Sequence, residues 1–221
     1  MRSSKIDQGI EESKINMSDL MIQKYKNITK SKEIRVIIVI PGKKEGISMI
    51  FSKNLVEYLR EEGVTVREFY LPSRTNPFIL LKEFIRLKKE IKNFQPNIIH
   101  SNYGTMTSFF SAKGSFIHRI PLVITFRGSD LNNTTKIDGF FRNLFGRILS
   151  QLSALRASKI ICVSKKLQEK LWWRKDIAEI IPSPGVNLEL FTPIDKEKAR
   201  SILGWDNNKK VVLFNAKSFL F

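Results

Sequence analysis

The residues best suited to chemistry in this sequence lie at positions 125–132, which read Thr-Phe-Arg-Gly-Ser-Asp-Leu-Asn. Arg127 offers a guanidinium fork that fits phosphate or carboxylate groups. Gly128 permits a tight turn, and Ser129 adds a hydroxyl group. Asp130 can orient Arg127 or accept hydrogen bonds from sugar hydroxyls. The loop predicts a substrate-binding site, and the alternative is a local Arg–Asp pair that only shapes the loop.

His100 is the second candidate for catalysis, because it ends the short apolar run that starts at Asn97. A histidine at a strand end can exchange protons near pH 7 or donate a hydrogen bond to a sugar hydroxyl. The alternative is a structural histidine bonded to a neighbouring loop. We predict His100 and Arg127 as the catalytic residues. His118 precedes a strand at its amino end, which is the wrong edge for a ligand, so we interpret it as structural.

Further loops supply candidate substrate-binding residues. Residues 41–48 read Pro-Gly-Lys-Lys-Glu-Gly-Ile-Ser, and Gly46 at a helix start would let an anion approach the backbone N–H groups. The loop lacks both the G-x-G-x-x-G and the G-x-x-x-x-G-K patterns, so an ordinary strand–helix turn is the alternative. We add Ser48 from the same loop, and Asn102 and Ser164 from two loops that follow later strands.

Alternating apolar strands and amphipathic helices must position these residues. The sequence predicts strands at residues 34–40, 64–71, 97–100, 121–125, 159–163 and 179–181, and helices at residues 47–62, 78–94, 105–117, 139–156 and 165–173. This alternation predicts an α/β fold with a doubly wound, mostly parallel, Rossmann-like sheet. Right-handed crossovers bring every strand-to-helix loop to one edge, where ligands bind in such sheets.

Composition narrows the partners and the compartment. The 221 residues carry a formal net charge of +17, which favours an anionic partner. No zinc-finger spacing or RNA-binding aromatic motif occurs, so we do not expect nucleic acid to be that partner. Cys162 lies in the apolar run 160–163 and is predicted to be a small core residue in a reducing compartment. With neither a membrane-spanning stretch nor a signal peptide in the sequence, we expect a cytoplasmic location.

The order of the elements indicates three parts. Residues 1–32 are polar and weakly periodic, which predicts a flexible N-terminal arm. Residues 33–193 form the Rossmann-like domain, and its last stretch, 177–193, reads as a hinge. Residues 194–221 add a helix and the apolar strand 211–214, which we expect to begin a second domain that the sequence does not complete.

These loops and strand ends resemble the N-terminal domain of the family-4 retaining glycosyltransferases, which have the two-domain GT-B architecture. That family carries a Gly-containing loop after the first strand, a D-(I/V)-(I/V)-H strand, a T-x-H-G-x-D loop, an A-D-x-(I/V)-I-x-V-S strand and a P-N-G-V-D-x-x-x-F-x-P hinge. The corresponding positions here are Gly46 and residues 97–100, 125–130, 157–164 and 185–193. Together the matches cover about residues 34–214 and follow the order of the family.

The sequence departs from the family pattern in two ways. Arg127 stands where the family has a histidine, so a proton-transfer role is lost there, although an arginine still suits phosphate or acidic groups. Asn97 replaces the acidic residue of the third strand, and Pro184 and Asn187 replace the Asn and Asp of the hinge. Because these are turn or hinge positions, we expect little functional cost.

The resemblance implies transfer of a sugar from a nucleotide-sugar donor to a glycan or lipid-linked acceptor, with retained anomeric configuration and without a metal or another cofactor. In such enzymes the N-terminal domain mainly binds the acceptor, and the C-terminal domain binds the nucleotide sugar. The donor groups of that second domain lie beyond Phe221, so we expect nucleotide-sugar binding only with the missing domain and little transfer by the chain alone.

Two further interpretations remain open. A non-catalytic α/β subunit could be completed by a separate donor-domain chain, and the coding sequence past Phe221 would distinguish this from a truncation. An epimerase with the same architecture would favour more carboxylates and histidines at the cleft than the two histidines here. The basic faces of helices 78–94 and 139–156 can dock on an anionic membrane surface or simply be solvated. Peripheral attachment to the inner face of the cell membrane would suit a lipid-linked acceptor.

Overall fold

The computed structural model describes residues 33–45, 49–132, 140–182 and 191–212. The chain divides into two compact units, Met1–Pro184 and Gly185–Phe221, and we describe each by itself. Gly46 and Ser48, the predicted N-terminal arm and residues 183–190 of the predicted hinge lie outside the described residues.

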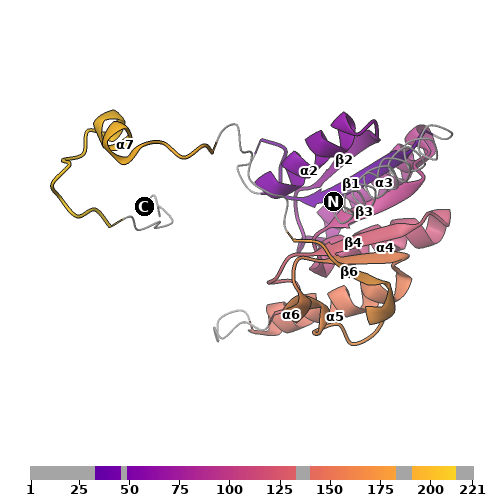
Figure 1. Cartoon of the computed structure of the whole chain (residues 1–221). Coiled ribbons are helices and arrows are strands. Elements are labelled where there is room, and N and C mark those ends of the chain that lie inside the picture. The colour runs from indigo at the N-terminus through magenta and orange to yellow at the C-terminus, as the bar shows by residue number, and fades with distance from the viewer. Residues whose placement is uncertain (1–32, 46–48, 133–139, 183–190, 213–221) are drawn as a thin grey trace, which may run out of the picture. The chain divides into compact units, whose positions relative to one another are not determined.

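The first unit is built on a six-stranded parallel sheet. Its strands are β1 (Arg35–Pro41), β2 (Thr65–Leu71), β3 (Ile98–Asn102), β4 (Leu122–Phe126), β5 (Lys159–Cys162) and β6 (Ala178–Ile180). They lie side by side in the order β2-β1-β3-β4-β5-β6, and every neighbouring pair is parallel (Figure 1). The doubly wound, Rossmann-like α/β fold expected from the alternating pattern is therefore confirmed.

Helices cover both faces of the sheet. They are α2 (Ile50–Glu61), α3 (Pro77–Phe94), α4 (Thr105–His118), α5 (Phe140–Arg156) and the short α6 (Lys165–Gln168). Val36, Ile38 and Ile40 of β1 pack against Val56 of α2 on one face. The alternate residues of the strands pack on the other face against α3, α4 and α5, and this larger core also buries Cys162. Cys162 is thus a core residue, as predicted, and burial raises the pKa of its thiol to about 11.

The helix boundaries follow from local chemistry. The side chain of Asn76 caps α3, because its Oδ1 accepts hydrogen bonds from the backbone N–H groups of Phe78 (3.0 Å) and Ile79 (3.1 Å). Pro77 occupies the first helical position, where its missing N–H costs nothing. Gln95 ends the helix in a left-handed conformation, immediately before Pro96. The predicted helix 165–173 is shorter than expected, since α6 stops at Gln168.

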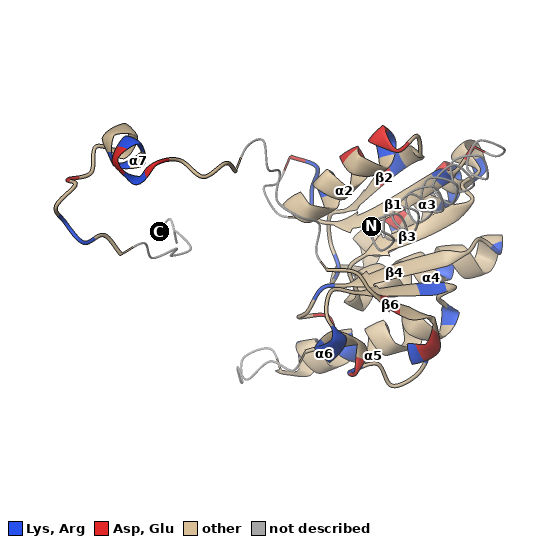
Figure 2. Ribbon diagram, viewed as in Figure 1, with Lys and Arg blue, Asp and Glu red and all other residues tan. Residues whose placement is uncertain are grey.

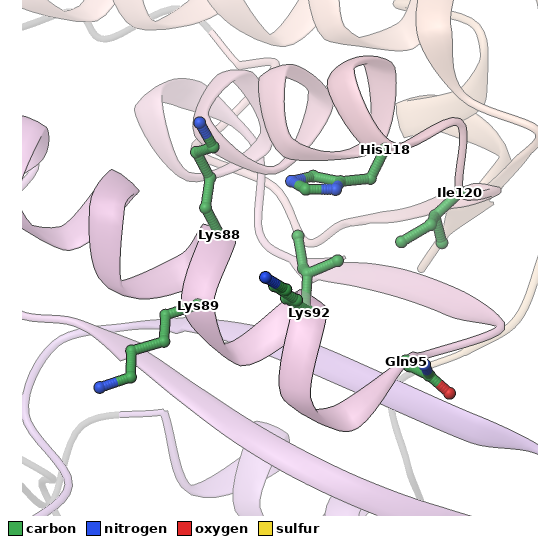
Figure 3. Close-up of a pocket in the computed structure, with 7 residues that line it drawn as sticks. Lys88, Lys89, Lys92, Gln95, His118 and Ile120 are labelled. Carbon is green, nitrogen blue, oxygen red and sulfur yellow. The ribbon is translucent and has the colours of Figure 1, made fainter.

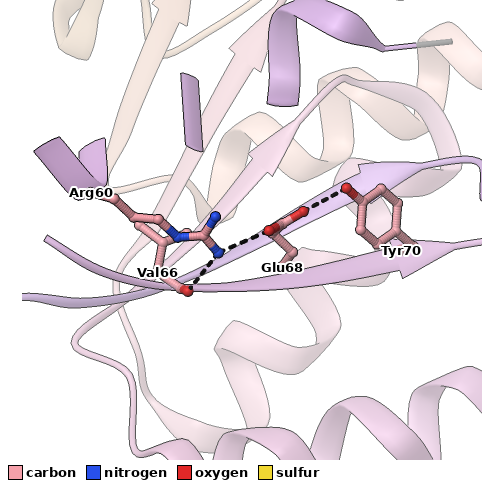
Figure 4. A network of polar contacts seen from close by, with 4 residues as sticks. All are labelled: Arg60, Val66, Glu68 and Tyr70. Atoms are coloured by element: carbon pink, nitrogen blue, oxygen red, sulfur yellow. Dashed lines mark hydrogen bonds and ion pairs between the residues drawn. The ribbon is translucent and has the colours of Figure 1, made fainter. Parts of the chain in front are cut away.

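A polar network fixes the edge strand β2 to α2 (Figure 4). Arg60 Nη2 donates hydrogen bonds to Glu68 Oε1 (2.8 Å) and to the backbone oxygen of Val66 (3.4 Å). The hydroxyl of Tyr70 donates to Glu68 Oε2 at 2.5 Å. Burial by itself raises the pKa of the Glu68 carboxyl, but the bonds from Tyr70 and Arg60 bring it below its ordinary value. The network ties the last turn of α2 to strand β2.

Several large apolar side chains of helix α5 point away from the core, although Leu149 is buried. Phe141 is 83% exposed, and Phe140, Phe145 and Leu152 are also exposed. The buried side instead carries small or polar residues such as Gly146, Ser150, Ser153 and Ala154. This side lies against α4, where Ser108 Oγ donates a hydrogen bond to Ser153 Oγ at 3.0 Å. Small side chains let the two helices approach closely, which leaves the large ones outside.

The second unit contains α7 (Lys196–Leu203), the helix expected after the hinge. Asp195 caps it by accepting hydrogen bonds from the backbone N–H groups of Glu197 (3.0 Å) and Lys198 (3.2 Å). Val211 and Val212, at the start of the predicted strand 211–214, are in no regular structure, and the rest of that segment lies outside the described residues.

Candidate functional site

Asp130 joins two loops at the carboxyl edge of the sheet. Its carboxylate accepts hydrogen bonds from the backbone N–H groups of Arg127 (3.0 Å) and Gly128 (2.7 Å) in its own loop. It also accepts one from the N–H of Gly104 (3.1 Å), in the loop between β3 and α4. Burial raises the pKa of the Asp130 carboxyl, and these three N–H groups counteract that rise. The side chain is completely buried, which favours the interpretation that Asp130 shapes the loop.

The side chain of Arg127 extends from this loop to the end of β3. Its Nε donates a hydrogen bond to Oδ1 of Asn102 at 2.9 Å. Its Cζ also lies 5.9 Å from the centre of the Phe51 ring in the first turn of α2. Burial lowers the pKa of the guanidinium below its ordinary value, and nearby Asp130 opposes that shift. An arginine in this setting stays protonated at neutral pH, so the edge of the sheet presents a fixed positive charge.

The amide of Asn102 is only half satisfied. Oδ1 accepts from Arg127, whereas Nδ2 is buried and finds no hydrogen-bond partner among the described residues. A buried N–H donor without a partner costs on the order of 1–3 kcal/mol. Such a donor at a ligand edge is suited to an incoming oxygen atom.

His100 lies on the same side of β3 as Asn102, two residues earlier, and is buried. Its Nε2 forms a 2.8 Å hydrogen bond with Oγ1 of Thr125. Burial, helped by the charge of Arg127, lowers the pKa of the imidazole to about 4. His100 is therefore neutral at pH 7, which favours a hydrogen-bonding role over proton exchange. The ring lines a largely apolar hollow of about 320 Å³ beside α2.

Backbone strain is concentrated where β3 meets α4. Tyr103 (φ 145°) and Thr105 (φ 59°) both have positive φ, at a cost of order 1–3 kcal/mol each. Between them, a Cβ on Gly104 would come within 2.6 Å of Ser150 Oγ and 2.7 Å of Asp130 Cβ. Only glycine fits there, because the backbone passes directly against the Asp130 loop.

Sequence reasoning missed four residues of this edge, namely Phe51, Tyr103, Gly104 and Ser150. Ser150 Oγ donates to the backbone oxygen of Asp130 (2.9 Å) and accepts from the N–H of Thr105 (2.7 Å). A glycine directly before a predicted helix, after a predicted strand, could have indicated Gly104. The other three are brought here from distant positions by tertiary contacts.

The remaining predicted residues divide into three groups. Ser129 is exposed, and its hydroxyl forms a short hydrogen bond with that of Tyr103. Ser164 is exposed at the start of α6 and makes no side-chain cap. Gly46 and Ser48 lie outside the described residues. The structure thus brings Arg127, Asn102 and the Asp130 loop together, and the roles of all these residues stay predictions.

The parallel sheet and its basic ligand edge agree with a comparison against known families. The family model described as Glycosyltransferase Family 4 matches residues 31–190. The chain belongs to glycosyltransferase family 4. The matched residues include all six strands and the loops that carry His100, Asn102 and Arg127.

Two curated relatives of this family-4 chain are transferases whose names contain a lipid-linked substrate. It is 29% identical over 188 residues to a UDP-N-acetylglucosamine–N-acetylmuramyl-(pentapeptide) pyrophosphoryl-undecaprenol N-acetylglucosamine transferase of Clostridium tetani, covering 84% of this chain and 47% of the relative. It is 29% identical over 199 residues to an N,N'-diacetylbacillosaminyl-diphospho-undecaprenol alpha-1,3-N-acetylgalactosaminyltransferase of Campylobacter jejuni, covering 83% and 51%. The chain spans about half the length of the curated relatives it matches.

Solved structures agree with the fold of the family-4 chain. A UDP-N-acetylglucosamine 2-epimerase matches with a TM-score of 0.52 and 14% identity, over 67% of this chain and 48% of that one. The Neisseria meningitidis UDP-GlcNAc 2-epimerase bound to UDP-GlcNAc matches with a TM-score of 0.50 and 12% identity, over 66% and 45%. At such low identity the likeness concerns the fold alone, so it adds nothing to the epimerase interpretation.

Two features are absent from the described residues of the family-4 chain. None of the described helices is both long and apolar enough to cross a membrane. Within the same residues, no three His, Cys, Asp or Glu side chains are grouped so that they could hold a metal ion.

Proposed function

We propose that this chain forms the acceptor-binding half of a retaining, hexosyl-transferring glycosyltransferase. The donor would be a nucleotide sugar, the acceptor a glycan or lipid-linked molecule, and the reaction would need no metal or other cofactor. One observation carries the proposal: Arg127 is held against Asn102 at the carboxyl edge of a family-4 sheet. The two relatives support a cell-envelope role, because both names contain a diphosphate-linked undecaprenol.

The chemistry proposed for this edge is positioning and electrostatic stabilisation. Arg127 would bind anionic groups of the acceptor, and the Asn102 amide would donate to a neighbouring oxygen. Neutral His100 would act by hydrogen bonding within the site, since burial keeps its pKa near 4. The Asp130 loop would keep Arg127 in place, so that little reorganisation is needed when substrate binds.

The proposal expects the donor nucleotide to be bound by a second domain, so the 221 residues alone should transfer little or no sugar. The test is an assay with radiolabelled UDP-GlcNAc and a prenyl-diphosphate saccharide, run with the chain alone and with the added C-terminal half of the Clostridium tetani relative. Transfer that needs both halves and is lost in Arg127→Ala would support the proposal. Strong transfer by the chain alone would contradict the division of labour.

The rival proposal is a non-catalytic α/β subunit that needs a separate donor-domain chain. The location of a donor domain in the genome distinguishes the two: one frame continuous with this chain favours a single enzyme, and a separate neighbouring frame favours a split one. Either way, the acceptor edge described here would be the part that this chain contributes.

We also propose peripheral attachment to an anionic membrane surface. The outward side of α3 carries the exposed apolar residues Phe78, Leu81 and Ile85, followed by the exposed Lys89 and Lys92. Figure 2 shows Lys and Arg along α3, where they outnumber the two acidic residues, Glu83 and Glu90. Such a surface combines insertion of apolar side chains with attraction of about 1 kcal/mol per Lys or Arg. A cytoplasmic location on the inner face of the membrane would follow.

A hollow of about 620 Å³ at the end of this surface supports the same proposal. In Figure 3 the side chains of Lys88, Lys92 and His118 lie around the gap between α3 and α4. The Nε2 atom of His118 is buried and has no hydrogen-bond partner among the described residues. A hollow lined by cations suits the phosphate of a lipid headgroup.

A further inference from the structure

Arg74 belongs to the same edge of the sheet as Arg127, although neither motif nor spacing pointed to it. It lies in the loop between β2 and α3, and its Cζ is 5.8 Å from the centre of the Tyr103 ring. The hydroxyl of Tyr103 in turn is hydrogen bonded to Ser129, two residues after Arg127. The loops that follow β2, β3 and β4 are thus connected through one aromatic side chain.

The cation of Arg74 has no acidic counterpart among the described residues. It is exposed, and across the described residues no carboxylate comes within ion-pair distance of it. The carboxylate of Asp130 is completely buried and accepts three backbone N–H groups. An arginine that stacks on a tyrosine keeps its fork of N–H donors pointing to the side, which leaves them available for an anion.

A second observation at this edge also points to an anionic or oxygen-bearing ligand. Asn102 is completely buried, and its Nδ2 finds no hydrogen-bond partner in the part of the chain that the structure describes. Its Oδ1 accepts the hydrogen bond from Arg127, and it directly precedes Tyr103 in the chain. The donors of Arg74, Asn102 and Arg127 therefore belong to one connected group around Tyr103.

We propose that Arg74, Asn102 and Arg127 form a subsite for the two phosphate groups of a prenyl-diphosphate-linked acceptor, with Tyr103 as the platform that positions Arg74. The proposal rests on the proposed function and names the acceptor group that this edge binds. Two arginines match a diphosphate better than a monophosphate, because each cation can face one phosphate. The strained backbone of Tyr103 is consistent with a ring that must stay under Arg74.

The test is isothermal titration calorimetry of the 221-residue chain with farnesyl diphosphate, farnesyl monophosphate and inorganic pyrophosphate. We expect farnesyl diphosphate to bind at least tenfold more tightly than farnesyl monophosphate. Arg74→Ala should weaken the diphosphate by about tenfold, and Arg74→Lys should recover only part of this loss, because an ammonium lacks the planar fork. The matched control is Arg119→Ala, an exposed arginine that follows the last turn of α4, at the opposite edge.

Pyrophosphate that binds as tightly as farnesyl diphosphate would assign the subsite to a soluble anion and overturn the lipid-linked part of the proposal. Binding that Arg74→Ala leaves within twofold of the wild-type chain would overturn the subsite. If Arg127→Ala alone abolishes binding, the proposed function survives without Arg74. If binding depends on Arg74 but no sugar is transferred with a donor half present, the subsite stands and the proposed function fails.

Discussion

The carboxylate of Asp130 accepts a hydrogen bond from the backbone N–H of Gly104, which lies 26 positions earlier in the chain (3.1 Å). This contact joins the loop after β3 to the loop after β4 and so fixes the distance between Asn102 and Arg127. The whole candidate site therefore depends on one buried carboxylate and on one residue without a side chain.

Replacing Asp130 with Asn should destabilise the fold. The amide keeps the size of the carboxylate but offers only one acceptor oxygen to the N–H groups of Arg127, Gly128 and Gly104, and it adds donors where none can be satisfied. We expect a loss of roughly 2–3 kcal/mol in the free energy of unfolding, measured by urea denaturation. The exposed Asp176→Asn is the matched control. Equal stability of the two variants would show that the three bonds contribute little.

Gly104→Ala should also destabilise the chain, by about 1–3 kcal/mol, because the new methyl group would meet Ser150, Asp130 and the Phe126 ring at 2.6–2.9 Å. Gly146→Ala is the comparison, since a Cβ there meets only the side chain of Thr105, at 3.2 Å and beyond. In thermal denaturation, the melting temperature of Gly104→Ala should be well below that of Gly146→Ala. The reverse order would mean that the loops after β3 and β4 can move apart without a loss of folding free energy.

Much of this arrangement follows from the sequence, because parallel strands bring all their carboxyl ends to one edge. The apolar runs predicted the strands closely, and the loops after them placed Asn102 and Arg127 together. The extension of β3 to Asn102 was missed, since it depends on pairing with Thr125 in the neighbouring strand.

Other features could not be predicted, because they depend on which surface meets which. An apolar stripe along a helix does not determine by itself which side of the helix faces the core. In α5 the side that contacts α4 carries the small residues around Ser150 and Ser153. The contacts of Arg127 with Phe51 and of Arg74 with Tyr103 join positions far apart in the sequence. The ionisation of His100 depends on its burial, which no local pattern encodes.

The buried imidazole of His100 should make stability depend on pH. The pKa of His100 is about 4 in the folded chain and 6.5 when the ring is exposed. Between pH 4 and pH 6.5 the imidazole is therefore protonated in the unfolded chain and neutral in the folded chain. The stability is fully present above pH 6.5 and declines as the pH falls towards 4, by up to about 3 kcal/mol. Urea denaturation from pH 7 to pH 4 measures this slope.

The control for this slope is His100→Gln, which can still bond to Thr125 but does not titrate. It should show a smaller decline than the wild-type chain over the same range, whereas His118→Gln retains His100 and should keep the decline. An NMR titration gives the pKa of His100 directly. A value near 6.5 would contradict the burial of the ring and reopen a proton-transfer role.

Charge reversal on α3 should release the chain from anionic membranes. The variant carries Lys88→Glu, Lys89→Glu and Lys92→Glu, and its binding to vesicles of 30% phosphatidylserine is measured by co-sedimentation at low salt. Since each lysine near the surface is worth about 1 kcal/mol, we expect at least a tenfold fall in the partition coefficient. The control reverses Lys196, Lys198 and Lys210, which are exposed in the second unit and change the net charge equally. Equal losses in both variants, or wild-type binding that is insensitive to salt and to anionic lipid, would contradict a specific membrane-binding surface on α3.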